Sequence, residues 1–332
     1  MKDESTTQRA HRQAVWARHW ASGAAHSCAG SYDQTYGGAI ASFWQEVHAL
    51  TAPGSRLLDI ATGNGALPRL LLQMRPELDV QIDAVDIVPM VPAWVHALPA
   101  AQAGRLRFHT EVAAESLPFP AASADLIVSQ YGLEYADLAR AVPELTRVRA
   151  PHGRIALVMH HAASRPVTLA AVEMGHIEWL RSPQGLLATA AAMVEPMARA
   201  ASEAGRAALA GDAVALAARA RFNAAQEELV ERARATDGAD VLFEARQAVV
   251  ELLNLARQQG HEAAGRAWAV LDITMADAHF RLAELRACAL GEAEAQAIKH
   301  ALEAQSLRCA LRTLSEGPHL MGWALTAESP QE

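Results

Sequence analysis

The sequence contains few cysteines and no excess of basic residues. Its three cysteines, Cys28, Cys288 and Cys309, are widely spaced and odd in number. This pattern favours reduced, packed thiols over a disulfide framework or a zinc site. Acidic residues outnumber basic ones by 37 to 29, which gives a formal net charge of −8. Because proteins that bind a nucleic-acid duplex normally carry a basic patch or a basic excess, we expect no nucleic-acid partner.

Long apolar segments are also absent. Residues 1–13 are polar and charged and lack the apolar core of a secretory signal. No segment reaches the roughly 18 uninterrupted apolar residues that a bilayer-spanning helix needs. We therefore expect a soluble, cytoplasmic protein with no membrane partner.

Several well-known catalytic motifs are missing. The sequence has no nucleophile elbow, no P-loop and no Cys-x-x-Cys motif. Its histidines show no paired metal-ligand spacing, so we expect no metal. The chemistry must come from another kind of site.

The pattern of apolar residues predicts a parallel sheet in the first half of the chain. The 332 residues suffice for about two domains of ~150 residues, and 51% of them are hydrophobic. Five short apolar runs alternate with helical stretches, as expected for βαβ units. These runs cover residues 56–61, 80–86, 106–109, 125–129 and 154–159. Two more runs, 306–314 and 320–327, flank a turn at Gly317 and Pro318 and predict an antiparallel pair.

Residues 165–300 have a different texture, dominated by strong helix formers. Residues 181–230 alone contain 18 alanines. Apolar residues between Val241 and Ala256 recur at three- and four-residue steps, and Gly260 follows as a stop. We expect a helical lid over residues 1–50, a sheet core over 51–164, a helical insertion over 165–300 and terminal strands over 301–328. The insertion would form a cap over the carboxyl ends of the strands or a homodimer surface.

A glycine-containing turn follows the first predicted strand. The segment is Asp59-Ile60-Ala61-Thr62-Gly63-Asn64-Gly65, and it opens a predicted helix over residues 67–74. Glycines at such a turn let the backbone approach a ligand closely. The dinucleotide-binding form needs a third glycine, but Pro68 stands at that position. Asp59 would suit a ligand with an ammonium group better than a pyrophosphate. Asp86, at the end of the second strand, is well placed to bind the hydroxyls of a ribose.

Together these residues resemble the class I S-adenosylmethionine-dependent methyltransferases, and most closely the small-molecule ubiquinone and menaquinone C-methyltransferases. The resemblance rests on Asp59-x-x-x-Gly63-x-Gly65, on Asp86 and on segments 114–120 and 125–135. It covers about residues 30–162 and the two terminal strands. It implies an α/β fold: a Rossmann-like sheet of seven mostly parallel strands with an antiparallel terminal strand. A large all-helical insertion would separate strands five and six.

The resemblance also implies a set of cofactor-binding residues. Asp59 and the turn containing Ala61, Gly63 and Gly65 would hold the methionine part. Asp86 would bind both ribose hydroxyls and Ile87 would pack on the adenine. Ala114 would offer its backbone amide to adenine N1, and Gln130 would lie under the sulfonium.

Two features of this site are left open. Members of the family usually have Asp or Asn where this chain has Ala113, bonded to the adenine amino group. Either Glu115 takes over this contact or the contact is missing. Tyr32 and Tyr36 would form a flap whose aromatic faces attract the sulfonium, or they would serve in packing alone.

Candidates for catalysis follow the fourth and fifth strands. His160 and His161 come directly after the fifth strand, and one of them would be a general base. Because side chains alternate along a strand, the two should face opposite ways. Glu134 and Tyr131 would hold or orient the acceptor. The alternative for each is an ordinary structural role at the end of a strand or the start of a helix.

We therefore expect an enzyme that moves a methyl group from S-adenosylmethionine to a small-molecule acceptor and releases S-adenosylhomocysteine. Oxygen or carbon is favoured over nitrogen as the accepting atom. Two alternatives remain: an NAD-type oxidoreductase on a Rossmann sheet, and a non-catalytic interaction protein that retains the fold. The missing third glycine and the acid before the turn count against the oxidoreductase.

Overall fold

The computed structural model describes residues 6–26 and 36–330. It divides the chain into two compact units. One unit comprises Met1–Val167 and Glu284–Glu332, and the other comprises Thr168–Ala283. The second unit is thus inserted into the sequence of the first.

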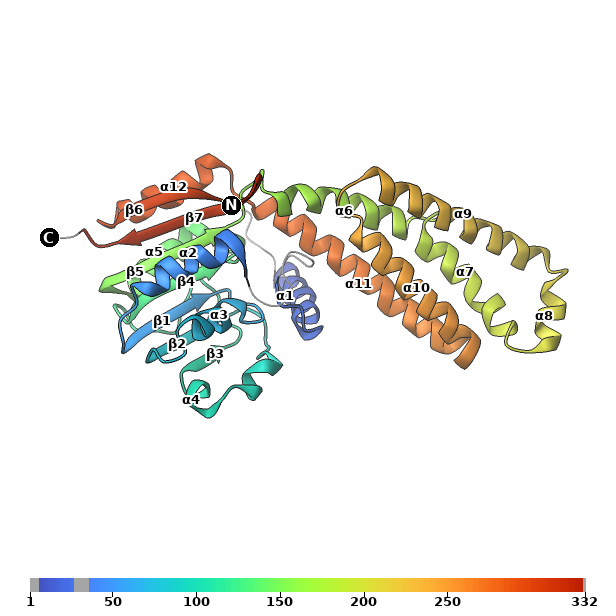
Figure 1. The fold of residues 1–332 in the computed structure, drawn as a ribbon, viewed down its shortest axis with the longest axis horizontal. Helices are drawn as coiled ribbons and strands as arrows, with labels where there is room; N and C mark the ends of the chain where they lie inside the picture. The colour runs from blue at the N-terminus through green and yellow to red at the C-terminus, as the bar shows by residue number, and fades with distance from the viewer. Residues whose placement is uncertain (1–5, 27–35, 331–332) are drawn as a thin grey trace. The chain divides into compact units, whose positions relative to one another are not determined.

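A seven-stranded sheet forms the centre of the first unit (Figure 1). Its strands are β1 (Ser55–Ile60), β2 (Val80–Val85), β3 (Leu106–His109), β4 (Ala124–Gln130), β5 (Arg149–Met159), β6 (Arg308–Glu316) and β7 (His319–Glu328). They lie in the order β3-β2-β1-β4-β5-β7-β6. β7 runs antiparallel to both of its neighbours, and the other pairs are parallel. This confirms the predicted sheet and its antiparallel terminal strand.

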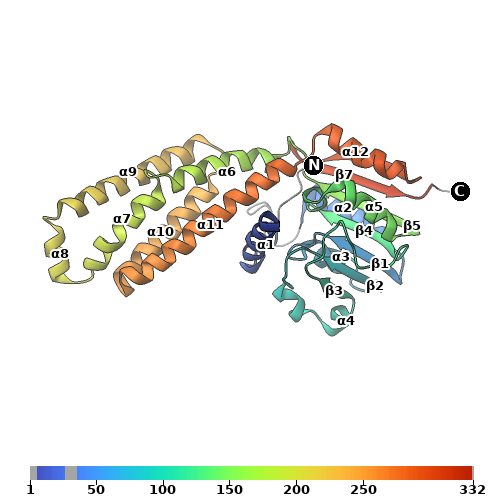
Figure 2. The same ribbon diagram turned by 180° about the vertical axis from the view of Figure 1, so that it is seen from behind.

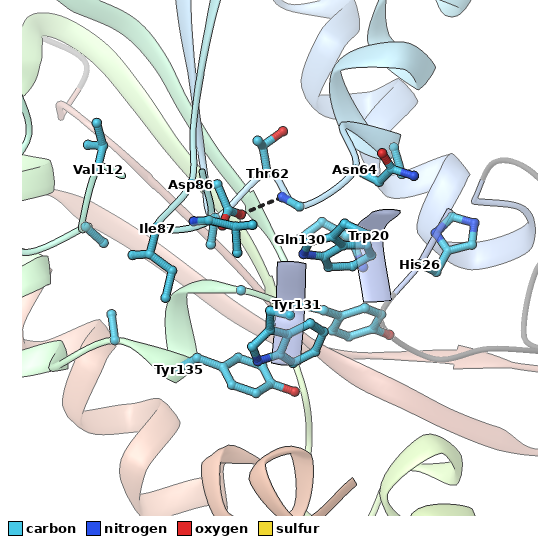
Figure 3. A pocket seen from close by; sticks show the side chains of 18 of the residues that line it. Trp20, His26, Thr62, Asn64, Asp86, Ile87, Val112, Gln130, Tyr131 and Tyr135 are labelled. Carbon is cyan, nitrogen blue, oxygen red and sulfur yellow. Dashed lines mark hydrogen bonds between the residues drawn. The ribbon is translucent and has the colours of Figure 1, made fainter. Parts of the chain in front are cut away.

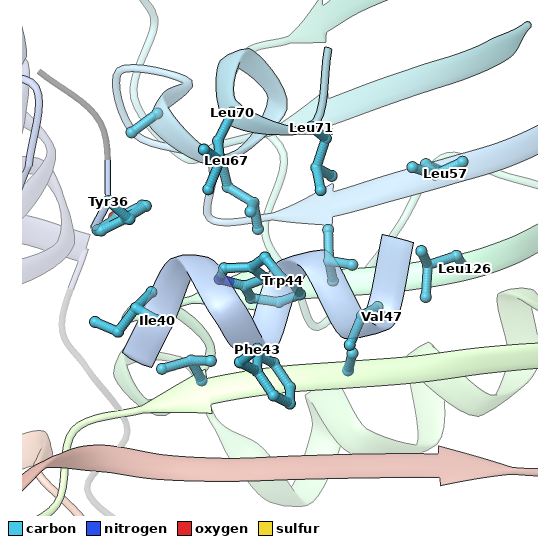
Figure 4. Close-up of a cluster of buried hydrophobic side chains, with 14 of the residues drawn as sticks. Tyr36, Ile40, Phe43, Trp44, Val47, Leu57, Leu67, Leu70, Leu71 and Leu126 are labelled. Carbon is cyan, nitrogen blue, oxygen red and sulfur yellow. The ribbon is translucent and has the colours of Figure 1, made fainter. Parts of the chain in front are cut away.

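Helices cover both faces of this sheet because its strands are apolar on both sides. Along β1, Leu57 packs with α2 (Gly38–Ala49) and α3 (Ala66–Met74), whereas Leu58 packs with α5 (Leu138–Val148) and α12 (Glu292–Glu303). Figure 4 shows side chains of α2 and α3, among them Trp44 and Leu71, gathered against β1 and β4. Alternation along a strand therefore produces two separate apolar layers.

The remaining elements of this unit are short or lie at its edge. They are α1 (Thr6–Ala21), η1 (Ala93–Ala97), α4 (Ala100–Ala103) and η2 (Leu133–Tyr135). Both η1 and η2 are single turns that follow strands, and η2 directly follows the end of β4. These turns shape the edge of the sheet where parallel strands end.

The second unit is entirely helical in the described residues. Its helices are α6 (Arg165–Arg181), α7 (Leu186–Arg199), α8 (Glu203–Leu209), α9 (Ala213–Ala235), α10 (Asp240–Gln259) and α11 (His261–Cys288), with α6 and α11 also reaching into the first unit. α7 packs against both α9 and α10 (Figure 2). The apolar residues predicted on one face of α10 are all buried, and Gly260 ends that helix with a φ of 88°. The helical insertion between the fifth and sixth strands is therefore confirmed.

The end of the insertion differs from the expected residue 300. α12 belongs to the first unit, where Ala295, Ile298 and Leu302 are buried against the sheet. Its composition is as rich in helix formers as that of the insertion, so composition alone could not separate them. In the described residues, no helix is both long and apolar enough to span a bilayer.

Candidate functional site

The glycine turn between β1 and α3 forms the base of a pocket (Figure 3). Gly63 and Gly65 have φ values of 54° and 72°, in the left-handed region that favours glycine. A Cβ on Gly63 would lie 2.7 Å from the ring of Trp20. A Cβ on Gly65 would lie 2.7 Å from the ring of Phe108. Both positions thus require glycine, for the backbone conformation and for the close approach of aromatic rings.

Asp86 ties this turn to the end of β2. One of its carboxylate oxygens accepts a hydrogen bond from the Gly63 amide at 2.7 Å, and the other accepts from Val88 at 2.9 Å. Burial raises the pKa of Asp86, and the amides of Val88, Gly63 and Ile87 partly offset that rise. The side chain lines the pocket, so it combines a fixed position with access to a ligand.

Asp59 lies deeper than expected from the sequence. It belongs to β1, is 1% exposed and does not line the pocket. Neither of its carboxylate oxygens has a hydrogen bond of ordinary geometry within residues 6–26 and 36–330. Burial raises the pKa of Asp59 to about 8, with the nearby Thr62 hydroxyl lowering it and Asp86 raising it. The structure therefore places an unsatisfied carboxyl group beneath the turn, one residue inside the sheet.

The pocket has an apolar end and a polar middle (Figure 3). Ile87 and Val112 lie at the apolar end, and Ala114 also lines the pocket. Gln130, at the end of β4, lines the middle and accepts a hydrogen bond from the Trp44 indole at 2.6 Å. Its amide nitrogen is buried and has no hydrogen-bond partner in the described part of the chain. The pocket thus presents an unused hydrogen-bond donor.

Glu115 lines the pocket as expected, but its carboxylate is already engaged. One oxygen accepts a hydrogen bond from the Asp137 amide at 2.8 Å. This bond links the loop after β3 to the start of α5. The sequence left open whether Glu115 replaces the adenine contact that is lost at Ala113. In the structure, a carboxylate oxygen of Glu115 binds the protein backbone.

Tyr131 lines the pocket in an unusual backbone conformation. Its φ is 53°, which is rare for a bulky residue and concentrates at functional sites. Its ring is stacked on His160, with centroids 4.1 Å apart and planes 17° apart. Its hydroxyl donates to the carbonyl of Met321 at 3.0 Å. Tyr131 is therefore held both by its ring and by its hydroxyl.

His160 and Glu134 form a buried pair behind Tyr131. The His160 ring nitrogen Nδ1 lies 2.7 Å from a Glu134 oxygen that also accepts from the His160 amide at 2.8 Å. Both side chains are buried, and neither lines the pocket. His161 faces the other side of the sheet, where it stacks on Trp323 with centroids 4.4 Å apart. The two histidines face opposite ways, and the structure brings neither to the pocket wall.

Of the residues predicted to bind the cofactor, most line this one pocket. Those that do are Ala61, Gly63, Asp86, Ile87, Ala114, Glu115, Gln130 and Tyr36. Asp59 and Gly65 do not line it. Tyr32, predicted to share the flap, lies outside the described residues.

The sequence analysis missed several residues of the pocket wall. α1 contributes Trp16 and Trp20, and the segment after it contributes His26. Trp16 also donates to Glu284, 268 residues away in the sequence, at 3.0 Å. Residues 1–50 were expected to form a lid, but no periodic pattern marks His26 as part of a site. Only the three-dimensional structure brings it to the turn.

The polar atoms without partners indicate which ligand fits. Gln130 Nε2, the Thr62 hydroxyl and the Asp59 carboxyl group are buried without ordinary hydrogen bonds in the described residues. A buried polar group left unpaired costs about 1–3 kcal/mol, so such atoms favour a ligand that pairs with them. The carboxylate group of an amino-acid end would accept hydrogen bonds from the two of these groups that line the pocket, Gln130 and Thr62. The apolar end beside the Asp86 carboxylate suits a nucleoside.

Comparison with known proteins finds methyltransferases that are similar to the sheet core. Residues 58–157 match the family described as methyltransferase domain. A demethylmenaquinone methyltransferase from Thermus thermophilus is 34% identical over 111 residues, covering 33% of this chain and 49% of that protein. The uncharacterized methyltransferase YcgJ from Bacillus subtilis is 33% identical over 129 residues, covering 39% and 49%. The crystal structure of an S-adenosylmethionine-dependent methyltransferase from Mesorhizobium loti is 20% identical, with a TM-score of 0.33, covering 40% of this chain and 57% of that one.

The chain spans about half the length of these curated relatives. The matched segment contains the glycine turn, Asp86 and the end of β4. The comparisons confirm the resemblance to methyltransferases over this segment.

Proposed function

We propose that the chain transfers a methyl group from S-adenosylmethionine to a small organic acceptor, starting from the match of residues 58–157 to the methyltransferase domain family. One observation carries the proposal: in the described part of the chain, Gln130 Nε2 and the Thr62 hydroxyl are buried in a pocket-lining position without an ordinary hydrogen bond, beside a glycine turn that Asp86 holds. A zwitterionic amino acid joined to a nucleoside supplies the missing partners.

The residues have separate roles in this proposal. Asp86 accepts the ribose hydroxyls with the lone pairs that its two amide bonds leave available. Ile87 packs on the adenine and the Ala114 amide bonds its ring. Gln130 donates to the amino-acid end. When bound, S-adenosylmethionine supplies an activated methyl group whose leaving group is neutral, so the protein mainly has to position the acceptor.

Oxygen or carbon remains the favoured accepting atom. Tyr36, Tyr131 and Tyr135 line the pocket, although the chain has only 4 tyrosines. Their rings suit a flat, unsaturated acceptor, since aromatic pairs contribute about 0.5–1.5 kcal/mol beyond area burial. The relative named demethylmenaquinone methyltransferase supports an acceptor of the quinone type.

In this proposal one catalytic candidate contacts the acceptor, and two others position that residue. Tyr131 contacts the acceptor, while His160 and Glu134 hold its ring in place from behind. The stack of 4.1 Å and the Nδ1 contact of 2.7 Å support this division, because both fix the Tyr131 ring. His161, which contacts Trp323, has a structural role.

A labelling experiment tests the proposal. The full chain is incubated with S-adenosylmethionine carrying a deuterated methyl group and with a small-molecule extract, and products are sought by their mass shift. Calorimetry with S-adenosylmethionine and with NADH runs in parallel. We expect labelled product and binding of S-adenosylmethionine alone; binding of NADH without S-adenosylmethionine would favour the oxidoreductase.

Two predictions concern the assembly of the protein. It stays a prediction that the helical insertion forms a cap or a homodimer surface. The absence of a nucleic-acid partner also stays a prediction. Light scattering of the full chain measures the oligomeric state. Deletion of residues 168–283 with a short linker tests whether acceptor choice, but not cofactor binding, depends on the insertion.

A further inference from the structure

Two tryptophans of α1 line the pocket. Trp16 and Trp20 are about one helical turn apart, and their rings are stacked, with centroids 5.4 Å apart and planes 24° apart. Trp16 is 9% exposed, and Trp20 is half-buried. The ring of Tyr135, another residue of the wall, stands nearly perpendicular to the Trp16 ring, with centroids 5.9 Å apart. One helix therefore supplies the pocket with a packed aromatic surface.

Contacts on both sides of the stacked pair fix its level along the pocket. Trp20 lies over Gly63 in the glycine turn, because a Cβ on Gly63 would be 2.7 Å from the Trp20 ring. On the other side, the Gln13 side chain donates to the carbonyl of Ile87 at 2.9 Å, and Ile87 lies at the apolar end (Figure 3). Trp16 follows Gln13 by three residues and precedes Trp20 by four, so all three lie on one face of α1. The pair therefore spans the wall from the glycine turn towards the apolar end.

The glycine turn also brings together the groups proposed for the two parts of the cofactor. Thr62, whose buried hydroxyl would bind the amino-acid end, directly precedes Gly63. Asp86, which would accept the ribose hydroxyls, accepts a hydrogen bond from the Gly63 amide at 2.7 Å. In S-adenosylmethionine the sulfonium joins the amino-acid end to the ribose. Trp20 lies over Gly63, so its ring would lie next to the sulfonium.

The charge near the pair is balanced within the protein. The Glu284 carboxylate binds the Arg12 guanidinium and accepts a hydrogen bond from the Trp16 indole at 3.0 Å. Glu284 thereby offsets the positive charge that Arg12 brings to the pocket wall. The face of an aromatic ring is the negative side of its quadrupole, and tryptophan attracts cations best among the aromatic side chains. This wall is therefore suited to a ligand that carries a positive charge.

We propose that Trp20, supported by its stack on Trp16, binds the sulfonium through its aromatic ring and favours the charged cofactor over the uncharged product. The inference rests on the proposed function and names a specificity-determining residue for it. S-adenosylmethionine carries a positive charge on sulfur, whereas S-adenosylhomocysteine is a neutral thioether. The ring attracts the cation electrostatically, but the thioether keeps only dispersion contacts with it. Loss of the charge on methyl transfer therefore weakens this contact and favours release of the product.

The test measures how well the protein distinguishes the two compounds. Calorimetry on the full chain gives the Kd of S-adenosylhomocysteine and of S-adenosylmethionine, and the readout is the first divided by the second. A substitution that removes packing alone weakens both compounds, whereas loss of a cation-binding ring weakens the charged one more. We expect Trp20→Leu to lower the ratio by about 3- to 30-fold. Trp20→Phe keeps a smaller aromatic ring and should lower the ratio by a smaller factor.

Trp268→Leu is the matched control. Trp268 is half-buried and its indole donates to the carbonyl of Leu187 at 3.0 Å, but it belongs to the second unit and does not line the pocket. Its replacement removes the same indole ring elsewhere in the protein. The ratio of the two Kd values should stay within about twofold of wild type.

The outcomes separate cation binding from packing. An unchanged ratio in Trp20→Leu would overturn the inference even if both Kd values rose, because the ring would then only pack. If thermal unfolding shows that Trp20→Leu does not fold, Trp20→Phe is judged by the same criterion, and an unchanged ratio there overturns the inference. Either result, in a chain that binds both compounds and forms labelled product, leaves the proposed function intact. A wild-type chain that binds neither compound would instead overturn the proposed function and this inference together.

Discussion

The carboxyl group of Asp59 should make the stability of the first unit depend on pH. Burial raises its pKa from 3.8 to about 8, so the folded chain holds this proton more tightly than the unfolded chain. The contribution of this proton to the free energy of unfolding is complete below about pH 4 and is lost as the pH rises towards about 8. Each pKa unit corresponds to about 1.4 kcal/mol. Between about pH 5 and about pH 9, wild type should lose about 4 kcal/mol of unfolding free energy that Asp59→Asn keeps.

Urea unfolding at each pH measures this difference. The two units need not unfold together, so the signal should be hydrogen exchange in peptides of β1, detected by mass spectrometry. Asp79→Asn is the control, because Asp79 is exposed in the same unit and its replacement should change little. If the unfolding free energies of wild type and Asp59→Asn changed with pH in the same way, within about 1 kcal/mol, the buried carboxyl group would not be the cause of the pH dependence.

Three further substitutions test the pocket. Asp86→Asn should weaken S-adenosylmethionine binding at least tenfold, about 1.4 kcal/mol, and an unchanged Kd by calorimetry would contradict the ribose assignment. Gly63→Ala should destabilise the turn by about 1–2 kcal/mol, because its φ is 54° and its Cβ would meet the Trp20 ring. Thermal unfolding and cofactor binding would both report that change. Tyr131→Phe should lower the unfolding free energy by about 1 kcal/mol through the lost bond to Met321, while the cofactor Kd stays unchanged.

The part of the pocket around the glycine turn could be predicted because its residues follow one another along the chain. Asp59, Gly63 and Asp86 lie at or near the ends of β1 and β2, which are adjacent and parallel. In a parallel sheet, residues after neighbouring strands meet at the same edge. A local pattern therefore located this part of the pocket, although it did not show that Asp59 lies beneath the wall.

The arrangement around His160 could be predicted only in part. Alternation along β5 correctly separates His160 from His161. It does not show that Tyr131 adopts a φ of 53° and stands between His160 and the pocket. Left-handed conformations of bulky residues are set by tertiary contacts, here the stack on His160 and the bond to Met321. No sequence pattern encodes them.

The part of the pocket wall that α1 supplies depends on contacts that no local pattern contains. Trp16 is held by Glu284, and Trp20 lies over Gly63, so α1 is fixed by residues from two distant parts of the chain. His26 follows α1 and reaches the pocket only because α1 is anchored in this way. A substitution that releases the anchor, such as Glu284→Ala, should therefore disturb both the wall that α1 supplies and the Trp20 ring over the glycine turn. Calorimetry with S-adenosylmethionine would measure this effect, and an unchanged Kd would contradict it. The two parts of the wall are thus built differently: one from a continuous strand edge, the other from a helix held by long-range bonds.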